Sequence, residues 1–397
     1  MKILIASDTF YPNVNGASYF TQRLAAMLVQ RGNEVSVIAP STSFKETTTH
    51  KDGAKVYGVR SIGVPVYPDF RISPLWLTQK SIRRIVKEID PDIIHIQNHF
   101  MIGKGCLKVA KELNIPIVGT NHFMPENLVH HLHLPRFLDQ MLKKIAWGQF
   151  INVFNQLEAV TTPTITAAKL IEDLGFKKEV IPLSNGIDLN RFNPKNNGEY
   201  LKERYQIPKD RKVMLFVGRL DKEKKIDVTL RAIPQIAKSI DVQFVIAGTG
   251  AYRAQLESLT KKLGIENRVT FTGFVPDEDL PNLYNTADLF VNAGIAELQC
   301  LVAMEAMASG LPVLAVNALA LPELCHDGEN GYLFTDGDSE GLATYAVKIL
   351  ENDELRKQMG GKSLEIIQAH DIGKIMDDYK ALYEKTIAEH GNKKLRK

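Results

Sequence analysis

The chain has 397 residues, a formal net charge of +3 and 24% charged residues. Single hydrophobic cores stop growing at about 250–300 residues, so this length predicts two domains. The nearly balanced charge excludes a disordered chain and general nucleic-acid binding. Cys106, Cys300 and Cys325 are widely spaced and form no C-x-x-C pair. This spacing argues against a disulfide framework or a zinc site and favours a reducing cytosol.

The amino-terminal segment MKILIASDTFYP has an apolar run too short for a signal peptide, and it is typical of a first strand. The longest uncharged stretch, 306–322, contains Gly310 and Pro312 and falls short of the roughly 20 apolar residues of a membrane-spanning helix. We therefore expect a cytoplasmic protein whose membrane contacts are peripheral.

Short apolar runs alternate with amphipathic stretches along the whole chain. Strands separated by helices favour right-handed crossovers and parallel sheets, so we predict two doubly wound, Rossmann-like α/β domains facing across a cleft. Helices are expected at 19–31, at GKGCLKVAKELN and at 228–238. The expected strands are KILIAS, EVSVIAP, DIIHIQ and IPIVGTNH, followed by KVMLFVGRL, VQFVIAGTG, RVTFTGF, ADLFVNAG and LPVLAVN.

The segment IPLSNGIDLNRFNP interrupts this alternation with clustered turn formers, including Asn185-Gly186 and Pro194. We place the domain boundary there, at residue 192. The first domain is then 1–192 and the second 193–371. Residues 372–397 are expected to form a helix that packs back on the first domain and ends in a frayed basic tail.

Ligands of open parallel sheets bind beyond the carboxyl ends of the strands, where helix N-termini offer unpaired N–H groups. Gly16 lies in the loop after the first strand, where it would let the backbone approach a phosphate, although the position taken alone favours an ordinary structural turn. Arg219 and Lys224 follow strand KVMLFV and suit a diphosphate, with a solvated loop as the alternative. The later GTG lacks the third glycine of a nicotinamide fingerprint and is interpreted as a turn.

Two glutamates, Glu297 and Glu305, lie in the otherwise nearly apolar stretch AELQCLVAMEAMASG. We expect Glu297 in a loop and Glu305 inside a helix that ends at Gly310. Carboxylates bind vicinal hydroxyls well, so one acid suits a sugar and the other a ribose. The backbone N–H groups of Leu301 and Val302, at the start of the helix, could hold the phosphate between them.

These residues resemble the retaining GT-B glycosyltransferases that include phosphatidylinositol mannosyltransferases and glucosyldiacylglycerol synthases. The resemblance covers nearly the whole chain. It rests on Gly16, SNGIDLNRFNP, GRLDKEKK, TGFVPDEDL, the E-x(7)-E pair, AMASGLPVLA and DGENGYLF. It implies transfer of a hexose from a UDP- or GDP-linked sugar to an acceptor hydroxyl, by front-face attack with retention and without a metal ion.

The resemblance also implies roles for individual residues. Arg219 and Lys224 would bind the donor diphosphate, with Gly16 approaching it from the first domain. Glu305 would bind the ribose, and Glu297 and His122 would face the transferred hexose, whereas the bare sequence context of His122 favours a structural histidine. The catalytic set is therefore His122, Glu297, Arg219 and Lys224. The remaining donor contacts would come from Val275, Gln299, Cys300, Leu301 and Val302.

One segment departs from the family pattern, because Leu298-Gln299-Cys300 stands where relatives have Gly-Phe-Gly. We expect this loop to adopt ordinary backbone angles and Gln299 to address a sugar hydroxyl. The departure leaves the donor sugar open. The acceptor is expected to be a membrane lipid such as diacylglycerol. The alternatives are a soluble acceptor (a small alcohol, phosphate ester or glycan), a sugar-nucleotide epimerase, and a non-catalytic nucleotide-sugar binder.

Two basic amphipathic stretches of the first domain are candidates for docking on an anionic membrane at the inner face of the cell. In the first, Ser73-Pro74 is expected to start a helix whose residues Ile82, Ile85, Val86 and Ile89 face inward. Packing of each helix on its own sheet is the alternative. The expected docking residues are Trp76, Lys80, Arg83, Arg84 and Lys87 in the first stretch and Lys143, Lys144 and Trp147 in the second.

Overall fold

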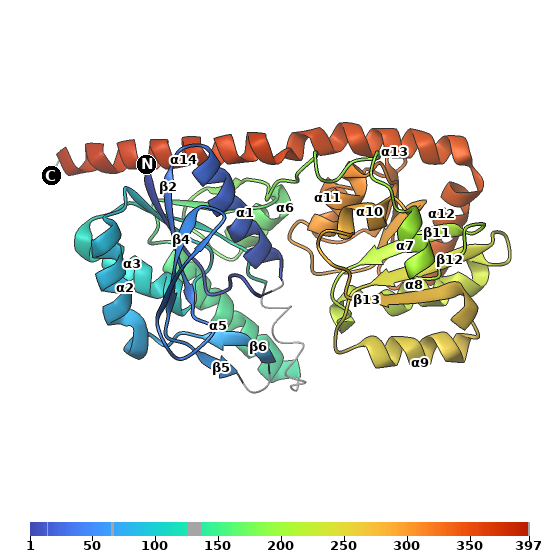
Figure 1. Cartoon of the computed structure of the whole chain (residues 1–397), viewed down its shortest axis with the longest axis horizontal. Helices are drawn as coiled ribbons and strands as arrows, with labels where there is room; N and C mark the ends of the chain where they lie inside the picture. The colour runs from blue at the N-terminus through green and yellow to red at the C-terminus, as the bar shows by residue number, and fades with distance from the viewer. Residues whose placement is uncertain (14, 65–66, 125–135, 396–397) are drawn as a thin grey trace. The chain divides into compact units, whose positions relative to one another are not determined.

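The computed structural model of the chain describes residues 1–13, 15–64, 67–124 and 136–395, which form two compact units (Figure 1). The first unit comprises Met1–Asn185 and Gly373–Lys397, and the second comprises Gly186–Ile372. The predicted boundary at residue 192 was thus too late. The reason is that Ile187 already belongs to the second unit, where its N–H donates to the carbonyl of His370 over 2.8 Å.

The first unit is built on an eight-stranded sheet with strand order β10-β9-β8-β7-β1-β2-β4-β3. All its pairings are parallel except that of β3 with β4. Its strands are β1 Lys2–Ala6, β2 Glu34–Pro40, β3 Thr47–Lys51, β4 Ala54–Val59, β7 Ile93–Ile96, β8 Ile117–Thr120, β9 Ala159–Thr162 and β10 Val180–Pro182. Its helices are α1 Gly16–Gln30, α2 Leu75–Ile89, α3 Met101–Leu113, α5 Arg136–Phe154, α6 Ile165–Asp173 and α14 Ile372–Leu395.

An insertion between β2 and α2 was not predicted from the sequence. It comprises β3, the antiparallel edge strand, its partner β4, and a small sheet of two antiparallel strands, β5 Ile62–Val64 and β6 Tyr67–Ile72. The residues of β3 are mostly exposed, with the sequence TTTHK. A polar edge strand buries no apolar face, so it lacks the hydrophobic alternation that reveals strands in a sequence.

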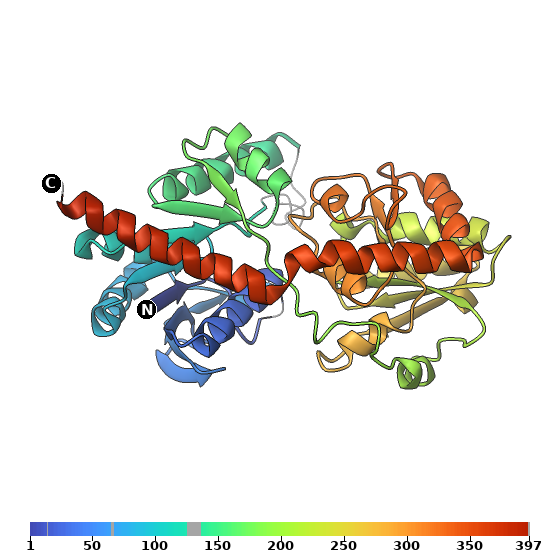
Figure 2. The same cartoon turned by 90° about the horizontal axis from the view of Figure 1, so that it is seen from above.

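The carboxyl-terminal helix α14 belongs to the first unit from Gly373 onward (Figure 2). Two of its tyrosines anchor it there. Tyr379 and Tyr383 are fully buried. The hydroxyl of Tyr383 lies 2.7 Å from Nδ1 of His95 on β7, and Nε2 of the same imidazole lies 2.7 Å from the Thr120 hydroxyl on β8. A buried imidazole must satisfy both nitrogens, so this chain of hydrogen bonds fixes the helix against the sheet.

The second unit has a six-stranded parallel sheet with strand order β13-β12-β11-β14-β15-β16, and helices lie on both sides of it (Figure 1). Its strands are β11 Lys212–Val217, β12 Val242–Ala247, β13 Val269–Gly273, β14 Leu289–Asn292, β15 Val313–Val316 and β16 Gly331–Phe334. Its α-helices are α7 Glu199–Arg204, α8 Ile226–Ile236, α9 Arg253–Leu263, α10 Leu280–Tyr284, α11 Leu301–Ala308, α12 Ser339–Glu351 and α13 Asp353–Ile367. Short 3₁₀ turns cover η2 Lys222–Lys224, η3 Glu266–Arg268, η4 Leu321–Glu323 and η5 Gln368–His370.

The nearly continuous apolar strands of both sheets follow from burial on two faces, as in β12, where all six residues are buried. The three cysteines are free and buried. Within the described residues, no helix combines the length and the apolar character that crossing a membrane requires.

Candidate active site

Two of the predicted site residues of the second unit, Lys224 and Glu297, meet because β11 and β14 are neighbours in its sheet. Lys224 lies in the loop after β11 and Glu297 in the loop after β14. Their side chains form an ion pair with 2.6 Å between Nζ and Oε1, at exposures of 17% and 14%. Burial alone would lower the pKa of Lys224, but the charge and hydrogen bond of Glu297 outweigh it, so the pKa is raised. Lys224 is therefore a cation at neutral pH.

Two acids that sequence reasoning missed hold Arg219 in place. Its guanidinium binds the Asp221 carboxylate through one terminal nitrogen, and the other lies 3.3 Å from Oε1 of Glu223. Both acids are buried, whereas the Arg219 side chain remains 39% exposed. A clamped yet accessible guanidinium is preorganised for an anionic ligand. The GRLDKEKK motif contained the signal, since its acids lie two and four residues after Arg219.

Gly294 is a second feature that sequence reasoning missed. A Cβ at this position would lie 3.0 Å from Oδ1 of Asn292 and 3.5 Å from both Glu297 Oε1 and Lys224 Cα. The backbone between β14 and α11 therefore passes close beside the ion pair. A side chain at this point would crowd the Asn292 amide and would touch both partners of the ion pair.

Glu305 lies inside α11, as predicted, and the residue is 9% exposed. One carboxylate oxygen accepts a 2.6 Å hydrogen bond from the hydroxyl of Tyr284. Tyr284 is fully buried, and burial together with Glu305 raises its pKa well above the usual value. The phenol thus stays protonated and orients the carboxylate. Gly310 follows the helix with a φ of +78°, the expected termination.

One residue of the loop that departs from the family pattern does not adopt ordinary backbone angles, contrary to our expectation. Cys300 has φ +68° and ψ +72°, in the left-handed region. The chain keeps this conformation because Cys300 precedes α11, where its carbonyl accepts from Ala303 N, and its Sγ accepts from Asn292 Nδ2.

The other predicted donor contacts lie at the start of α11 and beyond β13. Gln299 is buried, and Leu301 and Val302 come before Ala303, which donates the first hydrogen bond of the helix. Their N–H groups start α11 as predicted, and Val275 is buried in the core beyond β13.

Cys300 therefore allows a stability prediction. Left-handed angles cost a residue with a Cβ about 1–2 kcal/mol and are worst for β-branched side chains. We expect Cys300→Val to lower the free energy of unfolding by about 2 kcal/mol, and Cys300→Gly to change it by less than about 1 kcal/mol. Urea unfolding measures both. Cys325→Val is the control, since Cys325 is also buried but has no positive φ. Equal losses for the valine and glycine variants of Cys300 would contradict this account.

The remaining predicted site residues lie in the first unit. Gly16 is the first residue of α1, whose N-cap Asn15 accepts a 2.9 Å hydrogen bond from Ser18 N. His122 follows β8, with Nε2 3.0 Å from Oε1 of Gln97 and its ring centroid 4.8 Å from that of Phe20. Desolvation lowers the pKa of His122 below its usual range, so the imidazole is neutral at pH 7.

On α2 the predicted apolar face is buried, and Trp76 is 81% exposed. Two of the predicted docking cations are paired with acids, because Arg83 lies 3.2 Å from Glu112 and Arg84 lies 2.9 Å from Glu46. Lys80 and Lys87 are exposed and form no ion pair with the described residues. The helix begins at Leu75 with Pro74 as N-cap. Ser73 therefore does not cap it, and the Ser73 hydroxyl has no hydrogen-bond partner among the described residues.

On α5 the prediction for Trp147 was wrong. This indole is 8% exposed and packs against Phe123 and Phe150, with ring centroids 6.0 and 5.5 Å away. Phe123, from another segment, and Phe150, three residues later on the same helix, cover the indole. Lys144 is exposed and Lys143 is half-buried. Near them, the apolar side chains of Met141 and Ile145 face solvent, at 49% and 48% exposure.

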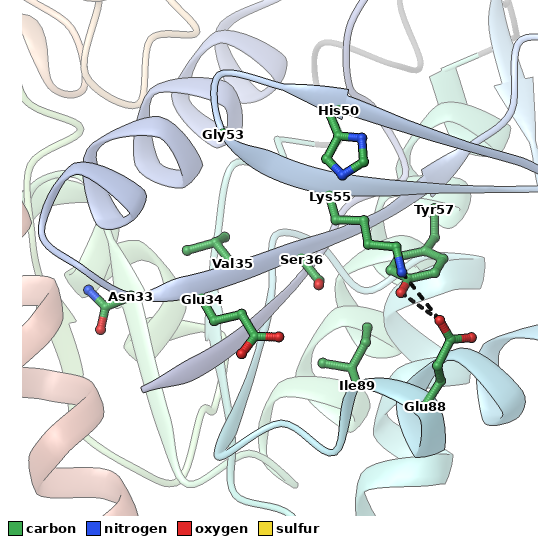
Figure 3. A pocket seen from close by; sticks show the side chains of 10 residues that line it. All are labelled: Asn33, Glu34, Val35, Ser36, His50, Gly53, Lys55, Tyr57, Glu88 and Ile89. Carbon is green, nitrogen blue, oxygen red and sulfur yellow. Dashed lines mark hydrogen bonds and ion pairs between the residues drawn. The ribbon is translucent and has the colours of Figure 1, made fainter.

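A pocket of about 230 Å³ lies elsewhere in the first unit, between β2, β4 and the end of α2 (Figure 3). There the hydroxyl of Tyr57 and Nζ of Lys55 both bind Oε1 of Glu88, over 3.0 and 3.3 Å. The pocket is lined by the amino-terminal residues of β2, so it opens at the sheet edge opposite to that of His122. It is not the candidate active site.

Comparison with known proteins decides the family. Residues 14–191 match the model for Glycosyltransferase Family 4, and residues 199–365 match that for Glycosyl transferases group 1. The chain belongs to the GT-B glycosyltransferases of family 4. The predicted fold class is thereby confirmed, as is the reaction class of a retaining, nucleotide-sugar-dependent hexosyltransferase.

Three relatives illustrate this GT-B family. The α-monoglucosyldiacylglycerol synthase of Streptococcus pneumoniae is 27% identical over 96% of this chain and 85% of its own length. A GDP-mannose-dependent α-mannosyltransferase of Mycobacterium tuberculosis is 28% identical over 91% of both chains. An Anabaena protein solved with UDP and glucose has a TM-score of 0.78 at 20% identity, covering 97% of this glycosyltransferase and 100% of that chain.

Proposed function

We propose that this glycosyltransferase transfers a hexose from a nucleoside diphosphate sugar to the hydroxyl of a membrane lipid such as diacylglycerol. The observation that carries the proposal is the Lys224–Glu297 ion pair beside the clamped Arg219, where β11 and β14 end. Two cations and a carboxylate at a sheet's carboxyl edge suit a diphosphate joined to a sugar. The glucosyldiacylglycerol synthase among the relatives supports the lipid acceptor.

In this proposal the residues of the second unit bind the donor. Arg219 and Lys224 neutralise the diphosphate, Glu305 accepts from the ribose hydroxyls and Glu297 from the hexose. The first N–H groups of α11, at Leu301 and Val302, point their positive dipole end at phosphate. Val275, Gln299 and Cys300 line the same donor site, and in the first unit Gly16 approaches phosphate and His122 faces the hexose.

The acceptor hydroxyl attacks the anomeric carbon on the face from which the diphosphate departs. The C–O bond to the diphosphate breaks, and the departing oxygen takes the proton of the acceptor hydroxyl. Arg219 and Lys224 stabilise the charge that develops on the leaving group, and no protein nucleophile is needed. Because these cations can neutralise a diphosphate, we also propose that transfer needs no metal ion.

The test is release of nucleoside diphosphate from UDP- and GDP-linked hexoses, with and without diacylglycerol and with and without EDTA. We expect nucleoside diphosphate to be released from one of the two donors, only when diacylglycerol is present, and also in the presence of EDTA. Release that depends on a soluble alcohol, phosphate ester or glycan would overturn the lipid acceptor. Loss of activity in EDTA would overturn the metal-independent mechanism.

We further propose that the first unit docks peripherally on an anionic membrane. Trp76 is exposed at the start of α2, and Lys80 and Lys87 extend from the same helix without acid partners among the described residues. Arg83 and Arg84 contribute less, because Glu112 and Glu46 neutralise them. The exposed Lys144 and its apolar neighbours on α5 are a second contact.

The two unpaired lysines allow a direct test of docking. Each basic residue near an anionic surface contributes about 1 kcal/mol, so Lys80→Glu with Lys87→Glu is expected to weaken vesicle binding by more than about tenfold. Co-sedimentation with anionic and neutral vesicles at low salt measures it. The control makes the same charge change on α9 of the second unit, with Lys261→Glu and Lys262→Glu. Equal effects of the two double variants would disprove docking through α2.

A further inference from the structure

Gln97 and His122 form a hydrogen-bonded pair at the carboxyl ends of the neighbouring strands β7 and β8. Gln97 directly follows β7 and is fully buried, and its own N–H is bonded to the carbonyl of Ala6 on β1 over 2.9 Å. Its side-chain oxygen lies 3.0 Å from Nε2 of His122. Phe20 of α1 packs against the same imidazole ring, so the ring is held on two sides.

The pairing determines which nitrogen of His122 carries the proton. An amide oxygen can only accept, so the nitrogen that faces it must donate. The imidazole is neutral, since desolvation lowers its pKa, and a neutral imidazole that donates from Nε2 has a lone pair on Nδ1. The histidine can then accept one hydrogen bond, at Nδ1.

A second observation points to a ligand. The amide nitrogen of Gln97 is buried and has no hydrogen-bond partner among the described residues, and the same holds for the amide nitrogen of Asn121 beside His122. An unmade hydrogen bond costs a buried donor about 1–3 kcal/mol, so such groups usually have a partner in the functional state. A hydroxyl both donates and accepts hydrogen bonds, so it can donate to an imidazole nitrogen and accept from an amide N–H.

We propose that Gln97 is a positioning residue that holds His122 in the Nε2–H tautomer, so that Nδ1 accepts a hydrogen bond from a hydroxyl of the transferred hexose. This inference rests on the proposed role of His122. It goes beyond that role by naming the residue that fixes which nitrogen of His122 is protonated, and therefore the direction of the hydrogen bond to the sugar. The amide nitrogen of Gln97 then donates to a ligand oxygen.

The first test is the tautomer itself, observed by ¹⁵N NMR of the full-length protein with labelled histidine, with the His122 signals assigned from His122→Asn. The proposal expects a protonated Nε2 and an unprotonated Nδ1 at pH 7.5. Gln97→Met removes the acceptor at similar volume and is expected to mix the tautomers. A protonated Nδ1 in the unmodified protein, or unchanged signals in Gln97→Met, would overturn the proposal. This readout does not depend on which donor or acceptor the enzyme uses.

Turnover provides the second test. Loss of one hydrogen bond to the reacting sugar is expected to lower kcat of Gln97→Met roughly tenfold, with the affinity for nucleoside diphosphate unchanged. The control is Gln243→Met in the second unit, because Gln243 is also buried and bonds Thr270 and Arg211 over 2.9 and 2.8 Å. Unchanged kcat in Gln97→Met with altered tautomers would overturn the contact with the sugar. Unchanged kcat in His122→Asn would instead show that the proposed role of His122 is wrong.

The third test uses pH. The titratable group described beside His122 is His95, which is fully buried and whose own pKa is lowered chiefly by burial and further by His122. Gln97→Glu keeps an acceptor for Nε2 but adds a negative charge, which raises the pKa of His122. Protonation converts Nδ1 into a donor, so turnover of this variant is expected to fall from pH 8 to pH 6 relative to the unmodified enzyme. Parallel pH profiles would count against the proposal, because a purely structural glutamine would give them.

Discussion

Lys224→Met is expected to lower kcat by about 10²–10³, which is the usual effect of removing one preorganised group that stabilises developing negative charge. Lys224 lies 2.6 Å from Glu297, and the pair is largely shielded from water. The substitution therefore also leaves the Glu297 carboxylate unpaired and is expected to destabilise the fold by about 2 kcal/mol. Steady-state turnover and urea unfolding measure the two effects.

The double variant Lys224→Met with Glu297→Gln separates these effects. Removing the unpaired charge is expected to restore most of the lost stability, whereas turnover should stay low because neither group remains to act on the donor. Recovery of turnover together with stability would show that Lys224 serves only to neutralise Glu297. The assignment of Lys224 to the leaving group would then be wrong.

Arg219→Ala is expected to weaken binding of the nucleoside diphosphate by about ten- to a hundredfold, because a charge-assisted hydrogen bond contributes roughly 1.5–3 kcal/mol. The variant also leaves the carboxylates of Asp221 and Glu223 without the guanidinium that they bind, which adds repulsion toward a diphosphate. Calorimetric titration with UDP and with GDP measures the affinity.

A matched control for Arg219 is available in the same unit. Arg231 on α8 is also exposed and pairs loosely with an acid on its own helix, Asp227, at 3.9 Å. Arg231→Ala is expected to leave the affinity for both nucleotides unchanged. If Arg219→Ala bound them as tightly as this control, the diphosphate assignment would be disproved.

Glu305→Ala is also expected to weaken binding of both nucleotides, because Glu305 is proposed to accept hydrogen bonds from the ribose hydroxyls.

The sequence predicted the strands themselves, but it did not predict how the side chains beyond the strand ends pair with one another. The predicted strands of both units were found because each buried strand is a short apolar run between turn formers. The same pattern placed Lys224, Glu297 and Glu305 near one sheet edge. It could not show that Lys224 and Glu297 are paired, since they are far apart in sequence and meet only because β11 lies beside β14.

Three local expectations failed because neighbours in space, and not local preference, decided them. Trp147 is buried since Phe123 and Phe150 cover it. Cys300 adopts left-handed angles because its contacts with Ala303 and Asn292 compensate for the strain. The unit boundary precedes residue 192 because Ile187 bonds to His370, near the other end of the second unit.

The sequence by itself thus determined the two doubly wound sheets, the family and the chemical types of the residues proposed to bind the donor, because burial periodicity and motif spacing are local properties of the chain. Only the tertiary structure decided which acid holds which cation, which face of α2 and of α5 is exposed, and which side chain faces His122. These depend on contacts such as that of Gln97 with His122, made between strands that the sheet order alone brings together.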